Sequence, residues 1–136
     1  MILVFGGAYQ GKLEYALDKF DIAAEDVYRC SRDGEMDLSK TVIYGLEEFV
    51  YWCTENGVEA KTVLDSRFDT TEADPYLGTL AGTGKIFIAC DVSQGLVPMD
   101  ATDRAFREMM GRTLLHLSKE ADEVHRVFCG IGQRLK

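Results

Sequence analysis

The sequence contains few of the residues that mark linkers, metal clusters and polyanion-binding surfaces. Only two of its 136 residues are proline and two are histidine. Its four cysteines, Cys30, Cys53, Cys90 and Cys129, lie far apart and form no C-x-x-C pair, which argues against a zinc site and favours buried free thiols. The 15 basic residues against 23 acidic ones give a formal net charge of -8. The chain as a whole therefore has no electrostatic attraction for nucleic acid or an acidic membrane.

Long apolar runs are also missing, so we expect no membrane span, and the first residues lack the pattern of a signal peptide. These absences favour a cytoplasmic protein. The length of 136 residues and the 46% hydrophobic content are those of one ordinary domain with a sizeable core. We expect residues 1–136 to form a single domain.

Short apolar runs alternate with amphipathic stretches along the chain. The runs predict strands at residues 2–5, 27–30, 41–44, 62–64, 86–90 and 124–129. Amphipathic spacing predicts helices at 11–20, 46–55 and 103–119, and the Gly/Thr-rich residues 69–84 indicate a loop. Continuous apolar runs are typical of strands covered on both faces. The pattern therefore predicts a three-layer α/β fold with a mostly parallel central sheet flanked by helices.

The turn after the first predicted strand has the spacing of a phosphate-binding loop, G-x-x-x-x-G-K. Glycines in such a loop turn backbone N–H groups toward phosphate oxygens, and the lysine reaches the terminal phosphates. The following helix adds its N-terminus. The predicted nucleotide-binding residues are Gly6, Gly7, Ala8, Tyr9, Gln10, Gly11, Lys12 and Leu13. A glycine-rich turn with an incidental lysine is the alternative interpretation.

The residue after Lys12 lacks the hydroxyl that normally binds Mg²⁺ in this motif. Leu13 cannot coordinate a metal, so phosphate binding can persist while phosphoryl transfer is weakened. An acidic partner is expected at the end of another strand, and Asp65 and Asp91 each end a predicted strand. We predict Asp65 as the catalytic and Mg²⁺-binding partner of Lys12. An ordinary turn or helix-cap role is the alternative for either aspartate.

The C-terminal third resembles the bifunctional adenosylcobinamide kinase and adenosylcobinamide-phosphate guanylyltransferase family, the CobU family. The matching residues, in the family's order and near its spacing, are Asp91-Val92, Gly95 to Pro98, Phe106-Arg107-Glu108, Gly111-Arg112 and Ala121 to Val124. The N-terminal ILVFGGAYQGK is similar to the family's ILVTGGARSGKS. The resemblance implies a RecA-like P-loop fold, a homotrimer, and ATP or GTP with Mg²⁺ and a corrinoid as ligands. It also makes Asp65 the Walker B equivalent.

Two departures from the family pattern affect the expected activity. The family's guanylylated histidine lies after the second strand, where this chain has SRDGEMDLSK, and the only histidines are His116 and His125. We therefore expect the guanylyltransferase activity to be absent. The predicted kinase site lacks the metal-binding hydroxyl but keeps Lys12 and an acidic partner.

Two functions remain open from the sequence. One is a reduced corrinoid kinase in which Asp91, Arg107 and Arg112 contact substrate or phosphate, since a guanidinium pairs well with phosphate oxygens. The other is a nucleotide- or corrinoid-binding or scaffold module that has lost catalysis. A solvated helix face is the alternative for the arginines.

Overall fold

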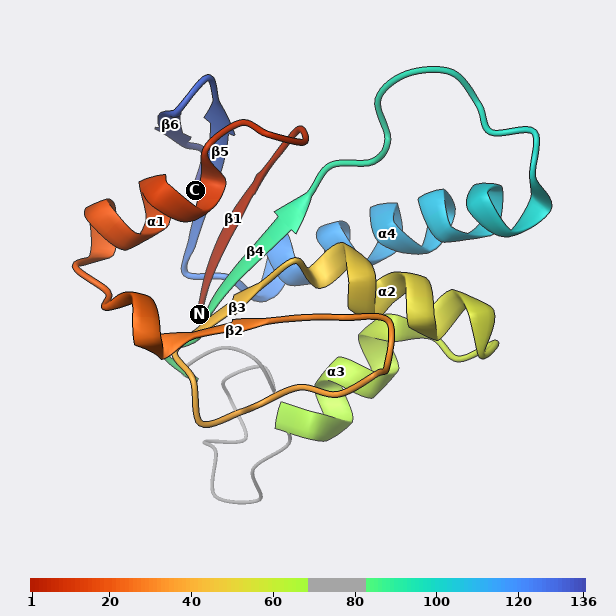
Figure 1. Cartoon of the computed structure of the whole chain (residues 1–136), viewed down its shortest axis with the longest axis horizontal. Helices are drawn as coiled ribbons and strands as arrows, with labels where there is room; N and C mark the ends of the chain where they lie inside the picture. The colour runs from red at the N-terminus through yellow and green to blue at the C-terminus, as the bar shows by residue number, and fades with distance from the viewer. Residues whose placement is uncertain (69–82) are drawn as a thin grey trace.

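The computed structural model describes residues 1–68 and 83–136, in which six strands form one sheet of order β2-β3-β4-β1-β5-β6. The strands are β1 Ile2–Gly6, β2 Val27–Arg29, β3 Val42–Tyr44, β4 Ile86–Cys90, β5 Glu123–Phe128 and β6 Ile131–Arg134. The first five run parallel, and β6 returns antiparallel to β5. Figure 1 shows β1 and β4 side by side in the middle of the sheet. Strand β1 therefore lies between β4 and β5, both of which follow residue 85 in the sequence.

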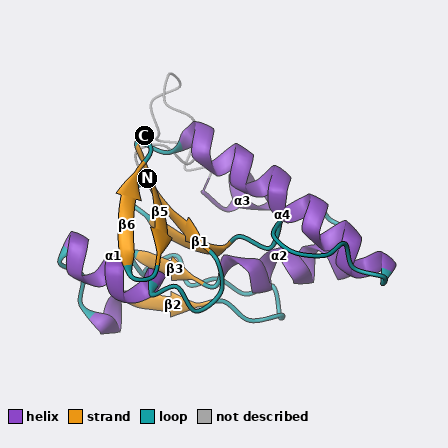
Figure 2. Ribbon diagram, turned by 90° about the horizontal axis from the view of Figure 1, so that it is seen from above, coloured by secondary structure: helices purple, strands orange, loops and turns teal. Residues whose placement is uncertain are grey.

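Helices cover both faces of the sheet, which gives the three predicted layers. The helices are α1 Lys12–Phe20, α2 Leu46–Glu55, α3 Ala60–Phe68 and α4 Ala101–Glu120, with one 3-10 turn, η1, at Ala24–Asp26. Figure 2 shows α1 on one side of the sheet and the other three helices on the opposite side. The predicted α/β fold and the predicted helices are confirmed. None of the described helices combines the length and the apolar character needed to cross a membrane.

The two faces of each central strand enter separate apolar clusters. Leu3, Ile43 and Phe87 pack with α2, α3 and α4, whereas Val4 and Ile88 pack on the side of α1. Successive strand residues point to opposite faces, so a strand covered on both sides must be apolar throughout. Every residue of β4 is buried. This is why the central strands appear in the sequence as unbroken apolar runs.

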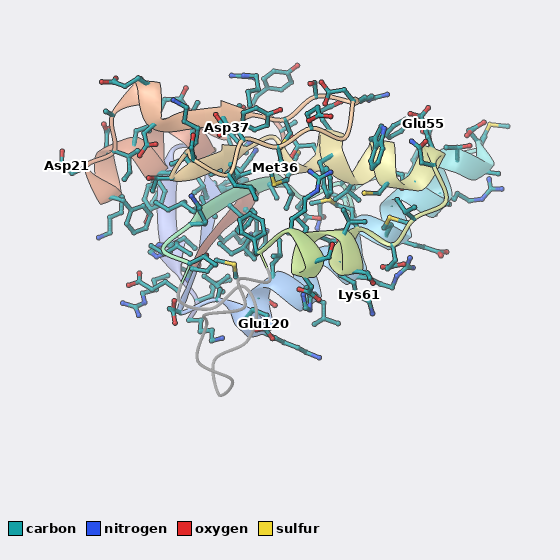
Figure 3. All side chains as sticks on the ribbon, turned by 90° about the horizontal axis from the view of Figure 1, so that it is seen from below. Asp21, Met36, Asp37, Glu55, Lys61 and Glu120 are labelled. Carbon is teal, nitrogen blue, oxygen red and sulfur yellow. The ribbon has the colours of Figure 1, made fainter. Side chains whose placement is uncertain are left out.

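The strand predicted at residues 62–64 is wrong, because these residues lie within α3. Ala60, Leu64 and Phe68 recur every four residues and are buried against the same cluster as α2 and α4. Figure 3 shows Lys61 on the outer side of α3 and Met36 reaching inward from the connection between β2 and β3. Most of the loop predicted at 69–84 lies outside the described residues.

Candidate functional site

The turn between β1 and α1 has the backbone conformation of a tight glycine-rich loop. Gly11 begins the helix in the left-handed region, at φ 75°, and Tyr9 adopts a similar conformation at φ 57°. Gly6 leaves no room for a side chain, because a Cβ there would lie 2.3 Å from the carbonyl oxygen of Val127. The loop can therefore follow this path only with glycine at the end of β1.

The loop is also bonded to the turn between β5 and β6. The backbone N–H of Cys129 donates to the Gln10 side-chain oxygen at 2.6 Å, and the N–H of Gly130 donates to the Gln10 carbonyl at 2.9 Å. Gly11 lies so close to this turn that its Cβ position is 3.3 Å from the Cα of Gly130. Residue Gln10 thus fixes the phosphate loop to the C-terminal hairpin.

A cavity of about 520 Å³ opens beside this loop. Its walls come from the loop and from α1, β3, α2 and β4. The lining residues are Ala8, Tyr9, Gln10, Gly11, Lys12, Leu13, Glu14, Tyr44, Glu47 and Cys90. Lys12 is buried, and its Nζ donates to the Gly7 carbonyl at 2.6 Å. The cavity lies at the carboxyl ends of parallel strands, the edge where open α/β sheets bind ligands.

Two carboxylates line the cavity with Lys12: Glu14 of the same helix and Glu47, which the sequence did not predict. Glu47 lies in the first turn of α2, just after β3, and its Oε2 accepts the backbone N–H of Cys90 at 2.9 Å. The signal was present in the sequence as an acidic residue two positions after the glycine that ends the run at residues 41–44. Glu47 falls within the helix predicted at 46–55, whereas Asp65 directly follows the apolar residues 62–64, which is the position expected for an acidic residue at the end of a strand.

Cys90 contributes a thiol to the same cavity at the end of β4. Burial raises its pKa, the Lys12 ammonium lowers it, and the carboxylate of Glu47 raises it further, with a net upward result. The thiol is therefore protonated at neutral pH. Its position beside Lys12 shows how closely the end of β4 approaches the loop.

Leu13 faces the apolar layer between α1 and the sheet, where it packs with the cluster that contains Val4 and Ala16. No group of three or more metal-ligating side chains occurs among the residues described by the structure. Protein sites for Mg²⁺ commonly supply one or two carboxylates and leave the remaining positions to phosphate oxygens and water. The Glu47 carboxylate fits that requirement, and Leu13 adds nothing to it.

Asp65 does not end a strand and does not line the cavity. It lies on α3, where its Oδ1 is 2.8 Å from Nε2 of His116 on α4. The prediction that Asp65 faces Lys12 depended on a strand at 62–64, so it fails with that strand. Glu47 takes the place in the site that Asp65 was expected to fill.

Asp91 is close to the loop through its backbone, since its N–H donates to the Gly6 carbonyl at 2.8 Å. Its carboxylate accepts hydrogen bonds from the Ser93 backbone and hydroxyl and from the Gln94 amide. Burial raises the pKa of Asp91, but these hydrogen bonds outweigh burial, and the net pKa is lowered. The side chain thus organises the turn after β4.

The predicted phosphate-binding arginines of α4 are engaged elsewhere. Arg107 donates to backbone carbonyls of Ser93, Leu96 and Gly95, and Arg112 forms an ion pair with Glu59 at 3.1 Å. Neither lines the cavity beside Lys12. Arg107 therefore ties the loop after β4 to α4.

Both histidines are also bonded away from the cavity. His125 is 1% exposed; its Nδ1 lies 2.9 Å from the Tyr15 hydroxyl and its Nε2 lies 2.9 Å from Glu123. His116 is paired with Asp65. Two partners hold the imidazole of His125 in place, and it has almost no contact with solvent.

Comparison with known families gives one match. The family described as cobinamide kinase / cobinamide phosphate guanyltransferase (CobU) matches residues 53–135. The chain belongs to this family. A role related to cobalamin biosynthesis follows, and the family's reactions use a nucleoside triphosphate and corrinoid substrates. A search among curated proteins found no match.

The matched range begins after the glycine-rich turn between β1 and α1, so the match of this CobU-family chain does not include that turn. The hydrogen bonds of Arg107 to Ser93, Gly95 and Leu96 lie wholly within the matched range. They join two of the sequence motifs that carry the resemblance. Of the residues that line the cavity, Cys90 lies within the matched range and the others precede it.

Proposed function

We propose that this chain is a cobinamide kinase that binds ATP or GTP at the phosphate loop and has lost the guanylyltransferase activity. The observation that carries the proposal is the cavity in which the loop, Lys12 and Glu47 meet at the carboxyl edge of the sheet. Family membership supplies the corrinoid as acceptor. Residues 1–136 would act as a single nucleotide-binding domain.

The loop would hold the phosphates through its backbone N–H groups and the N-terminus of α1, from Gly6 to Leu13. Lys12 would exchange its bond to the Gly7 carbonyl for a phosphate oxygen. The aminopropanol hydroxyl of cobinamide would then form a bond to the γ-phosphorus as the bond to the β,γ-bridging oxygen breaks; the nucleoside diphosphate would leave, and the hydroxyl proton would pass to water.

Electrostatics makes a divalent cation necessary for this binding mode. The charged lining residues are Lys12, Glu14 and Glu47, one positive and two negative. A bound Mg²⁺ would neutralise the charge that develops on the transferred phosphoryl group. We assign Glu47 rather than Asp65 as the protein carboxylate that holds it, together with phosphate oxygens.

The absence of a usable histidine supports the loss of guanylyl transfer. The family's covalent intermediate is formed on a histidine after the second strand, and the corresponding residues 31–40 contain none. His125 is buried between Tyr15 and Glu123, and His116 is paired with Asp65 on the surface of α4. Neither histidine lines the cavity.

The second candidate is a nucleotide- or corrinoid-binding or scaffold module without catalysis, and Leu13 favours it. At the position where the motif normally has a Mg²⁺-binding hydroxyl, this chain has Leu13, which packs in the apolar layer under α1. Nucleotide binding would then be retained through the loop and Lys12, while phosphoryl transfer would be lost. The homotrimer and the cytoplasmic location stay predictions from the sequence.

Calorimetry and product analysis test these proposals together. ATP and GTP are titrated with and without Mg²⁺ into the wild-type chain and into Lys12→Ala, and phosphorylated cobinamide is sought by mass spectrometry. A kinase shows Mg²⁺-dependent binding and phosphorylated product. Nucleotide binding without phosphorylated cobinamide would support the non-catalytic binding module. Absence of nucleotide binding would overturn the proposed nucleotide site. A GMP adduct on the protein after incubation with GTP would contradict the loss of guanylyl transfer.

A further inference from the structure

We infer that Arg29 supplies a second phosphate-binding cation to this site and contacts the terminal phosphoryl group of the bound nucleoside triphosphate. The inference rests on the proposed nucleotide site and assigns a residue that no sequence motif indicated. Arg29 and its neighbour Tyr44 are the last residues of β2 and β3. Both strands end at the edge of the sheet that carries the cavity.

Arg29 and Tyr44 lie on the same face of the sheet as the phosphate loop's helix. Arg29 is the partner of Tyr44 in the parallel register of β2 and β3. Across the sheet, Tyr44 is next to Ile88 of β4, and Ile88 is next to Val4 of β1; Ile88 and Val4 pack on the side of α1. The Arg29 guanidinium lies 4.5 Å from the centroid of the Tyr44 ring. Tyr44 itself lines the cavity. A cation–π contact thus holds Arg29 against Tyr44, directly beside the residues that line the cavity.

The guanidinium of Arg29 keeps its hydrogen-bonding capacity available. The ion pairs formed among residues 1–68 and 83–136 engage Arg32, Arg112 and Arg134, and none involves Arg29. Stacking on a ring uses the flat face of the guanidinium and leaves its N–H groups free for a planar acceptor. Arg29 is therefore exposed, oriented and able to pair with phosphate oxygens.

The charge of the cavity calls for such a group. Lys12 faces the carboxylates of Glu14 and Glu47, and the arginines of α4 are bonded to other residues. A polyphosphate with one lysine and one divalent cation is still incompletely neutralised. Arg29 would add the missing positive charge from the side of Tyr44.

Strand order selects the terminal phosphate as the group within reach. Strand β4 lies between β1, which leads into the loop, and β3, which carries Tyr44. Inner phosphates held by the loop direct the rest of the triphosphate across the end of β4 toward β3. The terminal phosphoryl group then lies nearest Arg29, and a diphosphate falls short of it.

The test compares nucleoside triphosphate with diphosphate in the presence of Mg²⁺, by calorimetry, for the wild-type chain and Arg29→Ala. Arg134→Ala is the matched control, because Arg134 lies on β6, the edge strand at the other side of the sheet from β2. We expect Arg29→Ala to weaken triphosphate binding about tenfold and diphosphate binding less than about twofold. Arg134→Ala should change neither affinity.

Two further variants keep the test decisive if Arg29→Ala folds poorly. Arg29→Lys retains the charge without the planar fork and should weaken triphosphate binding about threefold. Tyr44→Leu removes the ring on which Arg29 stacks and should reduce triphosphate binding in the same selective manner. Circular dichroism establishes that each variant is folded.

Failure of the inference is distinguishable from failure of the proposed function. If Arg29→Ala leaves triphosphate binding unchanged, or weakens both nucleotides equally, while Lys12→Ala abolishes binding, Arg29 is not a terminal-phosphate contact and the nucleotide site stands. If the wild-type chain binds neither nucleotide, the proposed function falls and this inference falls with it. The wild-type titration alone reveals that result.

Discussion

Two regions of the molecule bring acidic and basic side chains together, with opposite results. Between α3 and α4, Asp65 is bonded to His116 and Glu59 is paired with Arg112. At the sheet edge, Lys12 and Glu47 line one cavity and form no ion pair with each other. The charged side chains between α3 and α4 neutralise one another. Lys12 and Glu47 are bonded to the loop and to the end of β4 instead of to each other, so their charges stay available for a ligand.

Adding a methyl group at Gly6 should have the largest effect on the cavity at the sheet edge. In Gly6→Ala, the new Cβ would meet the Val127 carbonyl at 2.3 Å, and a backbone atom cannot move aside cheaply. We expect a loss of about 3 kcal/mol in the free energy of unfolding, measured in urea, together with loss of nucleotide binding.

Gly7→Ala is the matched control for this prediction. A Cβ at Gly7 would meet only the side chain of Gln10, at 3.5 Å. Its stability should stay within about 0.5 kcal/mol of wild type. Equal destabilisation by both substitutions would show that the contact with β5 does not fix the loop.

Removing the lysine should have the next largest effect. Lys12→Ala removes the ammonium group that faces the cavity and should weaken ATP and GTP binding about a hundredfold. Lys61→Ala changes the same charge on the outer side of α3 and should leave binding unchanged. Comparable losses in calorimetry for the two variants would mean that only net charge matters.

Replacing each of the two carboxylates, Glu47 and Asp65, by its amide tests the difference between the two regions directly. Glu47→Gln should reduce the Mg²⁺-dependent part of nucleotide affinity about tenfold, because the amide is a poor ligand for this hard cation. Asp65→Asn should leave nucleotide affinity unchanged, since Asp65 is bonded to His116 on α4. Titrations with and without Mg²⁺ separate the two; a larger effect from Asp65→Asn would restore the assignment made from the sequence.

Restoring the hydroxyl after Lys12 should have a smaller effect. Leu13→Ser offers Mg²⁺ the ligand that the motif normally provides and should strengthen Mg²⁺-dependent triphosphate binding about threefold. The same change removes apolar contacts under α1 and should lower stability by about 1 kcal/mol. Leu13→Ala should lower stability without the gain in binding. A gain in both variants would exclude metal coordination as its cause.

The smallest expected effect concerns the turn after β4. The folded-state pKa of Asp91 lies below its ordinary value of 3.8, so its ionised form stabilises the fold above that pH and the contribution is lost as pH falls through the folded value. Asp91→Asn should cost less than about 1 kcal/mol at pH 7, and this cost should shrink as the pH falls below 3.8. Urea unfolding of the variant and of the wild-type chain at several pH values measures the cost, and a cost that does not change with pH would contradict the prediction.

The sequence allowed the layers and most elements to be predicted because their signals are local. Unbroken apolar runs gave β1 and β4, and the spacing of Phe106, Met110 and Leu117 gave α4. Residues 62–64 include β-branched and apolar residues that also suit a strand. Their burial as part of a helix is set by packing against α2 and α4, which depends on residues distant in the sequence.

The glycine-rich turn proposed as the phosphate loop could be located from the sequence, since its residues are contiguous, but the carboxylate that shares its cavity could not. Which carboxylate faces Lys12 depends on the order of strands in the sheet, and that order is not local. Glu47 follows β3, two strands away from β1. Arg29 has no motif at all and is recognised only through its contact with Tyr44.

The position of β1 has a consequence for how the chain acquires its structure. Residues 2–6 are synthesised before residues 86–90 and 123–128, which are their neighbours in the sheet. The contacts of Gln10 form later still, because they require residues 129 and 130. Such distant pairing makes folding slow, and β1 stays without its neighbouring strands until they have been synthesised. The glycine-rich turn after β1 is therefore made before the residues that fix it, and termination before residue 129 would leave an exposed apolar strand and an incomplete cavity.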